Sequence, residues 1–127
     1  MSETPQFVVC LGSNTPRRTE IILSVIERLA GMCHIVSRSA MYEAPDESGL
    51  GEPYVNVVLS IDPKLSADEF RNELKQLERA FGRDAHSKAI GIMPLDADII
   101  IWDGDIVDPY QYSREYFQIG YREITAE

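Results

Sequence analysis

Cysteine and long hydrophobic runs are both scarce in this sequence. Its 127 residues include two cysteines, Cys10 and Cys33, which lie in apolar segments without metal-ligand spacing. We therefore expect buried, reduced thiols, with a disulfide as the alternative. No apolar run approaches the ~18 residues that a membrane-spanning helix requires, and Met1–Gln6 lacks the basic and apolar regions of an export signal. These absences predict a cytoplasmic protein.

Positive charge is also scarce. The chain has 12 Lys and Arg against 21 Asp and Glu, which gives a formal net charge of -9. This balance opposes contact with a nucleic-acid backbone or an anionic membrane, so we expect neither as a partner. A polyphosphate ligand would have to be neutralised locally, by a metal ion and a few well-placed cations. The sequence leaves the oligomeric state open.

Size and composition are those of an ordinary globular domain. The chain is 44% hydrophobic and 26% charged, near the average for folded proteins. A chain of this length buries a sizeable core without disulfides or structural metal. Because it shows no internal repeat and no linker, we expect one domain over residues 1–127.

The order of the expected elements is β-α-β-β-α-β. Patterning predicts strands at Phe7–Leu11, Cys33–Tyr42, Tyr54–Ile61 and from Leu95, with helices at Thr19–Ala30 and Ser66–Phe81. Ser66 and Glu69 fit a capping box. Residues 83–94 are expected to be irregular, and residues 108–127 to form a mixed tail. This order is typical of a ferredoxin-like α+β fold, an antiparallel sheet with helices packed on one face.

Two aspartates introduce the last predicted strand. Asp96 and Asp98 precede the apolar run Ile99–Trp102. Residues i and i+2 of a strand point to the same face, so these two Cα atoms should lie about 6.5 Å apart. Such carboxylates can share one or two hard divalent cations, which would relieve their mutual repulsion. Taken alone, the pattern fits two hydrated acids at a strand end equally well.

Four segments together resemble the hydroxymethyldihydropterin pyrophosphokinase family of folate biosynthesis. They are Leu11–Asn14, Tyr42–Pro45 followed by Tyr54–Asn56, Glu78–Arg83 in the form E-x-x-x-G-R, and Leu95–Ile99. The segments follow the family's order and cover roughly residues 6 to 117. Each is weak alone, but the set is specific.

The resemblance implies transfer of a diphosphate from ATP to the hydroxymethyl group of a reduced pterin, leaving AMP. It places Mg²⁺ on Asp96 and Asp98, which serve as metal ligands and catalytic residues. Magnesium favours one or two carboxylates together with phosphate oxygens. Phosphoryl-type transfer depends on positioning and charge stabilisation more than on covalent help.

The resemblance also implies binding residues for both substrates. For the pterin alcohol it implies walls formed by Tyr54 and Tyr116, a hydrogen bond from Asn56, and backbone contacts near Ala44 and Glu47. These residue types suit a flat heterocycle with donors and acceptors on its edge. For ATP the candidate residues are Arg83, which is also a catalytic residue, together with Glu78, Lys88 and Arg114. A dipole interaction for Arg83 and a solvated surface for Glu78 are the plainer alternatives.

The chain departs from the family pattern on the nucleotide side. The family tract W-G-P-R-x-L-D-x-D is replaced by Ile90–Asp98, so Met93 stands in place of an Arg and cannot donate to a phosphate. The segment Val107–Tyr110 lacks the family's His. His86 and Lys88 could supply positive charge, although surface positions without such a role are the plainer expectation. These changes predict activity that is weak or lost.

Three functions are consistent with these observations. The first is a Mg²⁺-dependent pterin pyrophosphokinase. The second is a catalytically impaired relative that binds a pterin or nucleotide as a sensor or scaffold. The third is a ferredoxin-like interaction module whose acids are surface residues. The combination of Tyr54, Asn56 and Arg83 with the acidic pair argues against the third.

Overall fold

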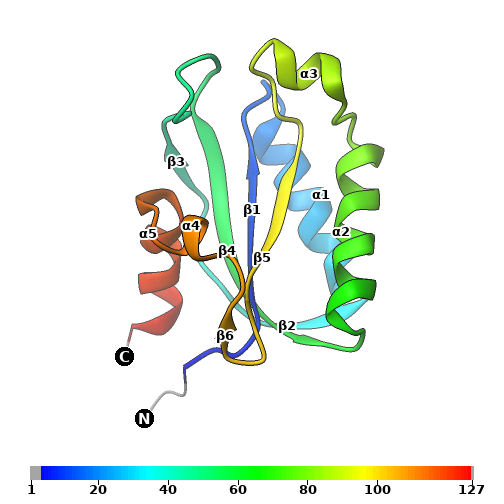
Figure 1. Ribbon diagram of the computed structural model, residues 1–127, viewed down its shortest axis with the longest axis vertical. Coiled ribbons are helices and arrows are strands. Elements are labelled where there is room, and N and C mark those ends of the chain that lie inside the picture. The colour runs from blue at the N-terminus through cyan, green and yellow to red at the C-terminus, as the bar shows by residue number, and fades with distance from the viewer. Residues whose placement is uncertain (1–3, 127) are drawn as a thin grey trace.

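The computed structural model describes residues 4–126 (Figure 1). Residues 1–3, on which part of the export-signal expectation rests, lie outside them. The strands are β1 Val8–Ser13, β2 Cys33–Arg38, β3 Tyr42–Ala44, β4 Tyr54–Pro63, β5 Asp96–Trp102 and β6 Asp105–Ile106. The helices are α1 Arg18–Ala30, α2 Ala67–Ala80, α3 Ala85–Ala89, α4 Pro109–Tyr112 and α5 Glu115–Thr125.

The strands form one antiparallel sheet in the order β2-β4-β1-β5-β6, with β3 also paired to β4. The first strand, β1, therefore lies in the centre between β4 and β5. Each of the helices α1 and α2 connects two strands that are not adjacent, as the split β-α-β pattern requires. The α+β fold expected from the sequence is confirmed.

Helices α1 and α2 cover one face of the sheet (Figure 1). Helix α2 begins where the sequence predicts it, because Ser66 and Glu69 form the reciprocal hydrogen bonds of a capping box. Its residues Phe70, Leu74 and Leu77 are buried at helical spacing. They pack against alternate residues of β1, β4 and β5, so one apolar stripe anchors the helix to the core.

The expectation that the helices cover only one face is wrong. Helix α5 packs on the opposite face, where Phe117 is fully buried against Val8, Val58 and Ile100. The aromatic residues of the supposed mixed tail lie at helical spacing and form this second core, in which Phe117 stacks on Tyr121 at 5.2 Å. Both faces of the central strands are apolar, and therefore both need a cover.

Two further boundaries differ from the sequence prediction. The expected strand Cys33–Tyr42 is divided, because the buried Ser39 hydroxyl accepts the N–H of Val58 in place of a backbone carbonyl. The segment 83–94, expected to be irregular, contains the short helix α3, which Asp84 and Ser87 cap reciprocally. At both places a side-chain oxygen accepts a backbone N–H, that of Val58 or that of Ser87.

Two expectations from composition can be compared with the described residues. Cys10 and Cys33 are both free and buried, as expected. None of the helices described in residues 4–126 has the length and apolar character needed to cross a membrane.

Gly120 of α5 offers a test of the second core. A Cβ atom at this position would lie 2.6 Å from Val58 Cγ2 and 2.9 Å from the Tyr42 ring. We expect Gly120→Ala to lower the free energy of unfolding by about 1–3 kcal/mol, because overpacking displaces the helix. The measurement is urea denaturation. Gly31→Ala is the matched control, since its Cβ would meet only the Arg28 carbonyl at 3.4 Å, and it should have little effect.

Candidate active site

The candidate site lies on the α5 face of the sheet, at the ends of β1, β4 and β5. Gly12 pairs with Asn56 on one side and with Asp96 on the other, so these residues form one row across three strands. A Cβ at Gly12 would lie 2.8 Å from Asn56 Oδ1 and 3.3 Å from the Tyr54 ring. The glycine of the Leu11–Asn14 motif therefore leaves space above the middle of the row.

An aromatic cavity of about 170 Å³ adjoins this row. It is lined by Ala44, Pro45, Asp46, Glu47, Tyr54, Asn56, Asp96 and Tyr116. Burial raises the pKa of Tyr54 to about 12, and it also raises the pKa of Tyr116, so both rings are neutral walls at physiological pH. All the residues proposed for the pterin thus come together in one place.

Asn56 is the most specific polar group of this aromatic cavity. The residue is 3% exposed, and its Nδ2 has no hydrogen-bond partner among the described residues. A buried amide without a partner is costly, and such costs are typically retained where a ligand supplies the missing bond. The orphaned donor therefore points to a ligand with an acceptor on its edge.

Asp96 and Asp98 lie side by side, and each contributes to a different cavity: Asp96 lines the aromatic one and Asp98 a second one. The pKa of Asp96 is raised well above its ordinary value, first by burial and then by the charge of Asp98 and a hydrogen bond between the two carboxyls. The side chain is nevertheless 35% exposed, so a ligand can reach it. This pair is an anionic centre that the Arg83 guanidinium, 3.4 Å from Asp96 Oδ1, neutralises only in part.

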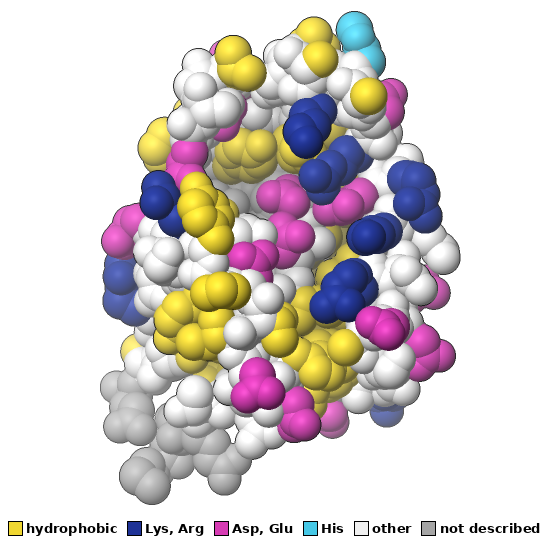
Figure 2. Space-filling model, viewed as in Figure 1, with side chains coloured by type: hydrophobic (Ala, Val, Ile, Leu, Met, Phe, Trp, Pro, Cys, Tyr) yellow, Lys and Arg dark blue, Asp and Glu magenta, His cyan; other side chains and the backbone are white. Residues whose placement is uncertain are grey.

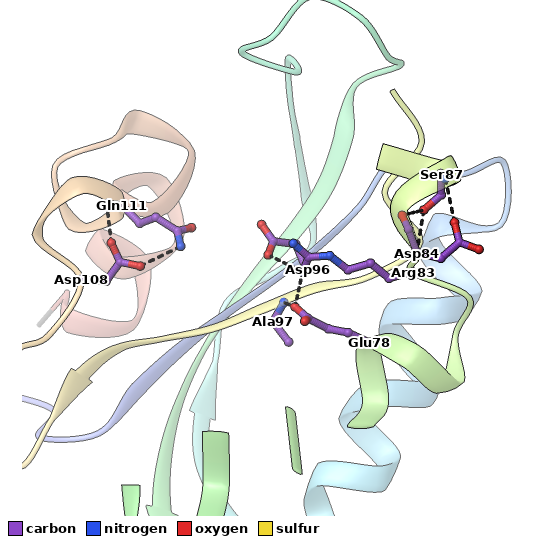
Figure 3. Close-up of polar contacts among 8 residues, drawn as sticks. All are labelled: Glu78, Arg83, Asp84, Ser87, Asp96, Ala97, Asp108 and Gln111. Carbon is purple, nitrogen blue, oxygen red and sulfur yellow. Dashed lines mark hydrogen bonds and ion pairs between the residues drawn. The ribbon is translucent and has the colours of Figure 1, made fainter. Parts of the chain in front are cut away.

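Arg83 and Glu78 lie beside Asp96 (Figure 3). Arg83 Nη1 contacts Glu78 Oε2 at 2.5 Å and Asp96 Oδ1 at 3.4 Å. Glu78 also accepts the N–H of Ala97 at 2.9 Å, and its side chain is 13% exposed, so the solvated-surface alternative is wrong. Burial raises the pKa of Glu78, while Ala97 and Arg83 oppose that shift. The E-x-x-x-G-R motif thus places one acid and one cation against β5.

The second cavity, of about 300 Å³, lies between α2 and β5. Its charged lining residues are Arg71, Lys75, Glu78, Arg83, Asp98 and Asp108. Arg71 and Lys75 are absent from the residues expected from the sequence. The available signal was their helical spacing with Glu78, since residues 71, 75 and 78 fall on one face of a helix. Figure 2 shows Lys and Arg side chains beside a group of acidic ones.

Lys88 and Arg114, both expected near the nucleotide, lie at different places. Lys88 is exposed on α3 and borders a hollow that also contains Lys75, Arg79 and Arg83. Arg114 forms two hydrogen bonds with Glu47 Oε2, at 2.6 and 2.8 Å, and lies over the Tyr110 ring. It therefore stands at the rim of the aromatic cavity rather than among the lining residues of the second one.

Two loops meet at the end of β1. Asn14 donates to the Gly91 carbonyl at 2.9 Å and accepts the N–H of Met93 at 2.6 Å. A Cβ at Gly51 would lie 2.1 Å from the Gly91 oxygen, so the loops before β4 and β5 are in close contact there. Asn14, the last residue of the Leu11–Asn14 motif, thus holds the segment before Asp96 against the end of β1 through two hydrogen bonds.

The donor set of the acidic pair suits a magnesium ion. Within residues 4–126, no group of three or more His, Cys, Asp or Glu side chains is placed to hold a metal. Magnesium does not need such a group, because it binds through one or two carboxylates and completes its shell with phosphate oxygens and water. Burial and then the charge of Asp98 raise the pKa of Asp96, and such a cation would offset both.

Comparison with known proteins agrees with this geometry. The family model for 7,8-dihydro-6-hydroxymethylpterin-pyrophosphokinase (HPPK) matches residues 8–126. The 2-amino-4-hydroxy-6-hydroxymethyldihydropteridine pyrophosphokinase of Haemophilus influenzae is 25% identical over 120 residues, which span 92% of this chain and 74% of that protein.

Two longer proteins are also similar. The folate synthesis bifunctional protein of Chlamydia trachomatis is 36% identical over 117 residues, and that of Arabidopsis thaliana is 28% identical over 99 residues. The matches cover 84% and 76% of this chain but 25% and 20% of the two relatives, so it corresponds to one part of each. Because the family model spans nearly every described residue, the chain belongs to the 7,8-dihydro-6-hydroxymethylpterin-pyrophosphokinase family.

Proposed function

We propose that this chain transfers a diphosphate group from ATP to the hydroxymethyl group of a reduced pterin, in a reaction that depends on Mg²⁺. Family membership supports the reaction class. The observation that carries the site assignment is the position of Asp96 and Asp98 between an aromatic cavity and a second one whose lining includes three cations, Arg71, Lys75 and Arg83. One cavity suits the flat pterin, and the other suits the phosphates.

The residues of the chain have distinct roles in this proposal. Tyr54 and Tyr116 enclose the pterin ring, and the free donor of Asn56 selects its edge and sets its orientation. Orientation matters because an alcohol held in line with the phosphorus reacts much faster than a free one. Asp96 and Asp98 would hold Mg²⁺, which when bound supplies neutralisation of the phosphate charge.

Arg83 has a positioning role and a catalytic role. Its guanidinium already contacts Glu78 and Asp96, which keeps it beside the acidic pair before substrates arrive. A cation fixed in this way stabilises the charge that develops on transferred phosphate without first having to reorganise. Glu78 supports it from α2.

We further propose that the chemical step is slow. Met93 offers no donor to the phosphates, and the residues around it, Ile90 and Ile92, are exposed and aliphatic. Losing one cation that acts in the transition state commonly costs two or three orders of magnitude in rate. No observation favours the alternative of a relative that only binds pterin or nucleotide.

The first test is Asp96→Asn. We expect turnover to fall about a thousandfold or more, because one metal-binding carboxylate is lost. The assay is the formation of AMP and diphosphorylated pterin from MgATP and the reduced pterin alcohol. Asp62→Asn, on the exposed far end of β4, is the control and should behave like the unchanged protein. Full activity in Asp96→Asn would show that the metal assignment is wrong.

Asn56→Ala tests the pterin site separately. Removing the buried amide should weaken binding of the reduced pterin about tenfold or more while leaving MgATP affinity unchanged, because the lost bond lies only in the aromatic cavity. Titration calorimetry measures both. Asn72→Ala, on the exposed face of α2, serves as the control. An Asn56→Ala variant with unaltered pterin affinity would contradict the proposed orientation.

The acidic pair also predicts how stability depends on pH. The folded state raises the pKa of the Asp96 carboxyl above its ordinary value of about 3.9, so folding favours proton uptake. The free energy of unfolding should therefore fall as the pH rises from that value through the raised pKa. Asp98→Asn removes a like charge and should reduce this fall, raising the melting temperature at neutral pH.

The measurement is the melting temperature in EDTA across this pH range, with Asp62→Asn as the control. Magnesium with a nucleotide should restore stability to the unchanged protein at neutral pH. Identical pH profiles for Asp98→Asn and the unchanged protein would show that repulsion between the two carboxyls is negligible.

A further inference from the structure

Helix α2 presents a charged stripe to the second cavity. Arg71, Lys75 and Glu78 all line this cavity, while the neighbouring stripe of Phe70, Leu74 and Leu77 is buried in the core. The buried stripe fixes the rotation of the helix, and therefore it also fixes where the charged one points. Glu78 reaches the backbone of β5, which places the stripe at the edge of that strand beside Asp98.

The cations of this stripe are available to a ligand. Arg83 is already engaged by Glu78 and Asp96. None of the ion pairs between residues 4–126 involves Lys75. The only one that involves Arg71 joins it to Asp68, whose side chain is 93% exposed, and such surface pairs contribute little. Two cations therefore face the cavity without a strong partner.

The distribution of charge across the chain makes this position unusual. The net charge is -9, yet five of the 12 Lys and Arg lie between residues 71 and 88, namely Arg71, Lys75, Arg79, Arg83 and Lys88. Figure 2 shows Lys and Arg side chains along one flank of the acidic centre. A triphosphate needs cations near the metal, and Met93 leaves the tract before Asp96 without one at that position.

We propose that Lys75, assisted by Arg71, binds the phosphate chain of the nucleotide. In this chain α2 thus supplies positive charge that the tract 90–94 does not. The inference rests on the proposed function for the identity of the nucleotide, but it concerns binding and does not require turnover. Lys75 acts through its charge on the phosphates, so adenosine alone should be insensitive to it.

The test is Lys75→Met, which keeps most of the apolar stem and removes the charge. Titration calorimetry with MgATP should show a dissociation constant raised about tenfold or more, whereas that for adenosine should stay unchanged. Lys75→Arg should retain MgATP affinity within a few-fold. Lys64→Met is the matched control, because Lys64 is exposed beyond the opposite end of β4, and it should alter neither constant.

Three outcomes would overturn this inference. The first is that Lys75→Met binds MgATP as tightly as the protein without the substitution. The second is that Lys75→Met loses affinity for adenosine and for MgATP equally. The third is that the protein without any substitution does not bind MgATP. An unaltered melting temperature shows that the variant is folded, as expected for an exposed helical position. Since binding is measured without the pterin, a chain that binds MgATP through Lys75 but never forms AMP would refute the proposed function and leave the inference intact.

Discussion

The row formed by Asn56, Gly12 and Asp96 is the constraint on which the site depends. Antiparallel pairing of β1 with both neighbours brings the amide proposed to bind the pterin and the carboxylate proposed to bind the metal to the same level of the sheet. A side chain on the middle residue would collide with Asn56 Oδ1. The backbone register and one missing Cβ therefore determine how far apart the Asn56 amide and the Asp96 carboxylate lie.

Electrostatics shows how an acidic protein could bind the polyphosphate that we propose as its ligand. The two aspartates repel each other in a partly buried place, which raises the pKa of Asp96 and creates a demand for cations. Arg83, just beyond the end of α2, neutralises part of this negative charge. Lys75 lines the cavity that also contains Asp98. The charge that the whole chain lacks is thus concentrated where a phosphate chain would lie. An acidic surface elsewhere does not prevent this local arrangement.

Residues near one another in the sequence were predicted well. The helix that starts after Ser66 and the side-by-side aspartates follow from local periodicity and capping, and both are found. The partner of Arg114 could not be predicted in this way. Its neighbours in the sequence gave no sign of Glu47, 67 residues away, yet the two side chains form two hydrogen bonds at the rim of the aromatic cavity. Pairing of that kind depends on how the elements pack.

The sequence by itself determined the element order, the carboxylate pair and the family resemblance, because each depends on spacing within a few residues or on motif order. Only the tertiary structure decided that α5 covers the second face and that Arg71 and Lys75 share a cavity with Asp98. Periodicity tells which face of an element is apolar but not which neighbour covers it. Long-range packing makes that choice, and with it the division of the site into an aromatic half and a charged half.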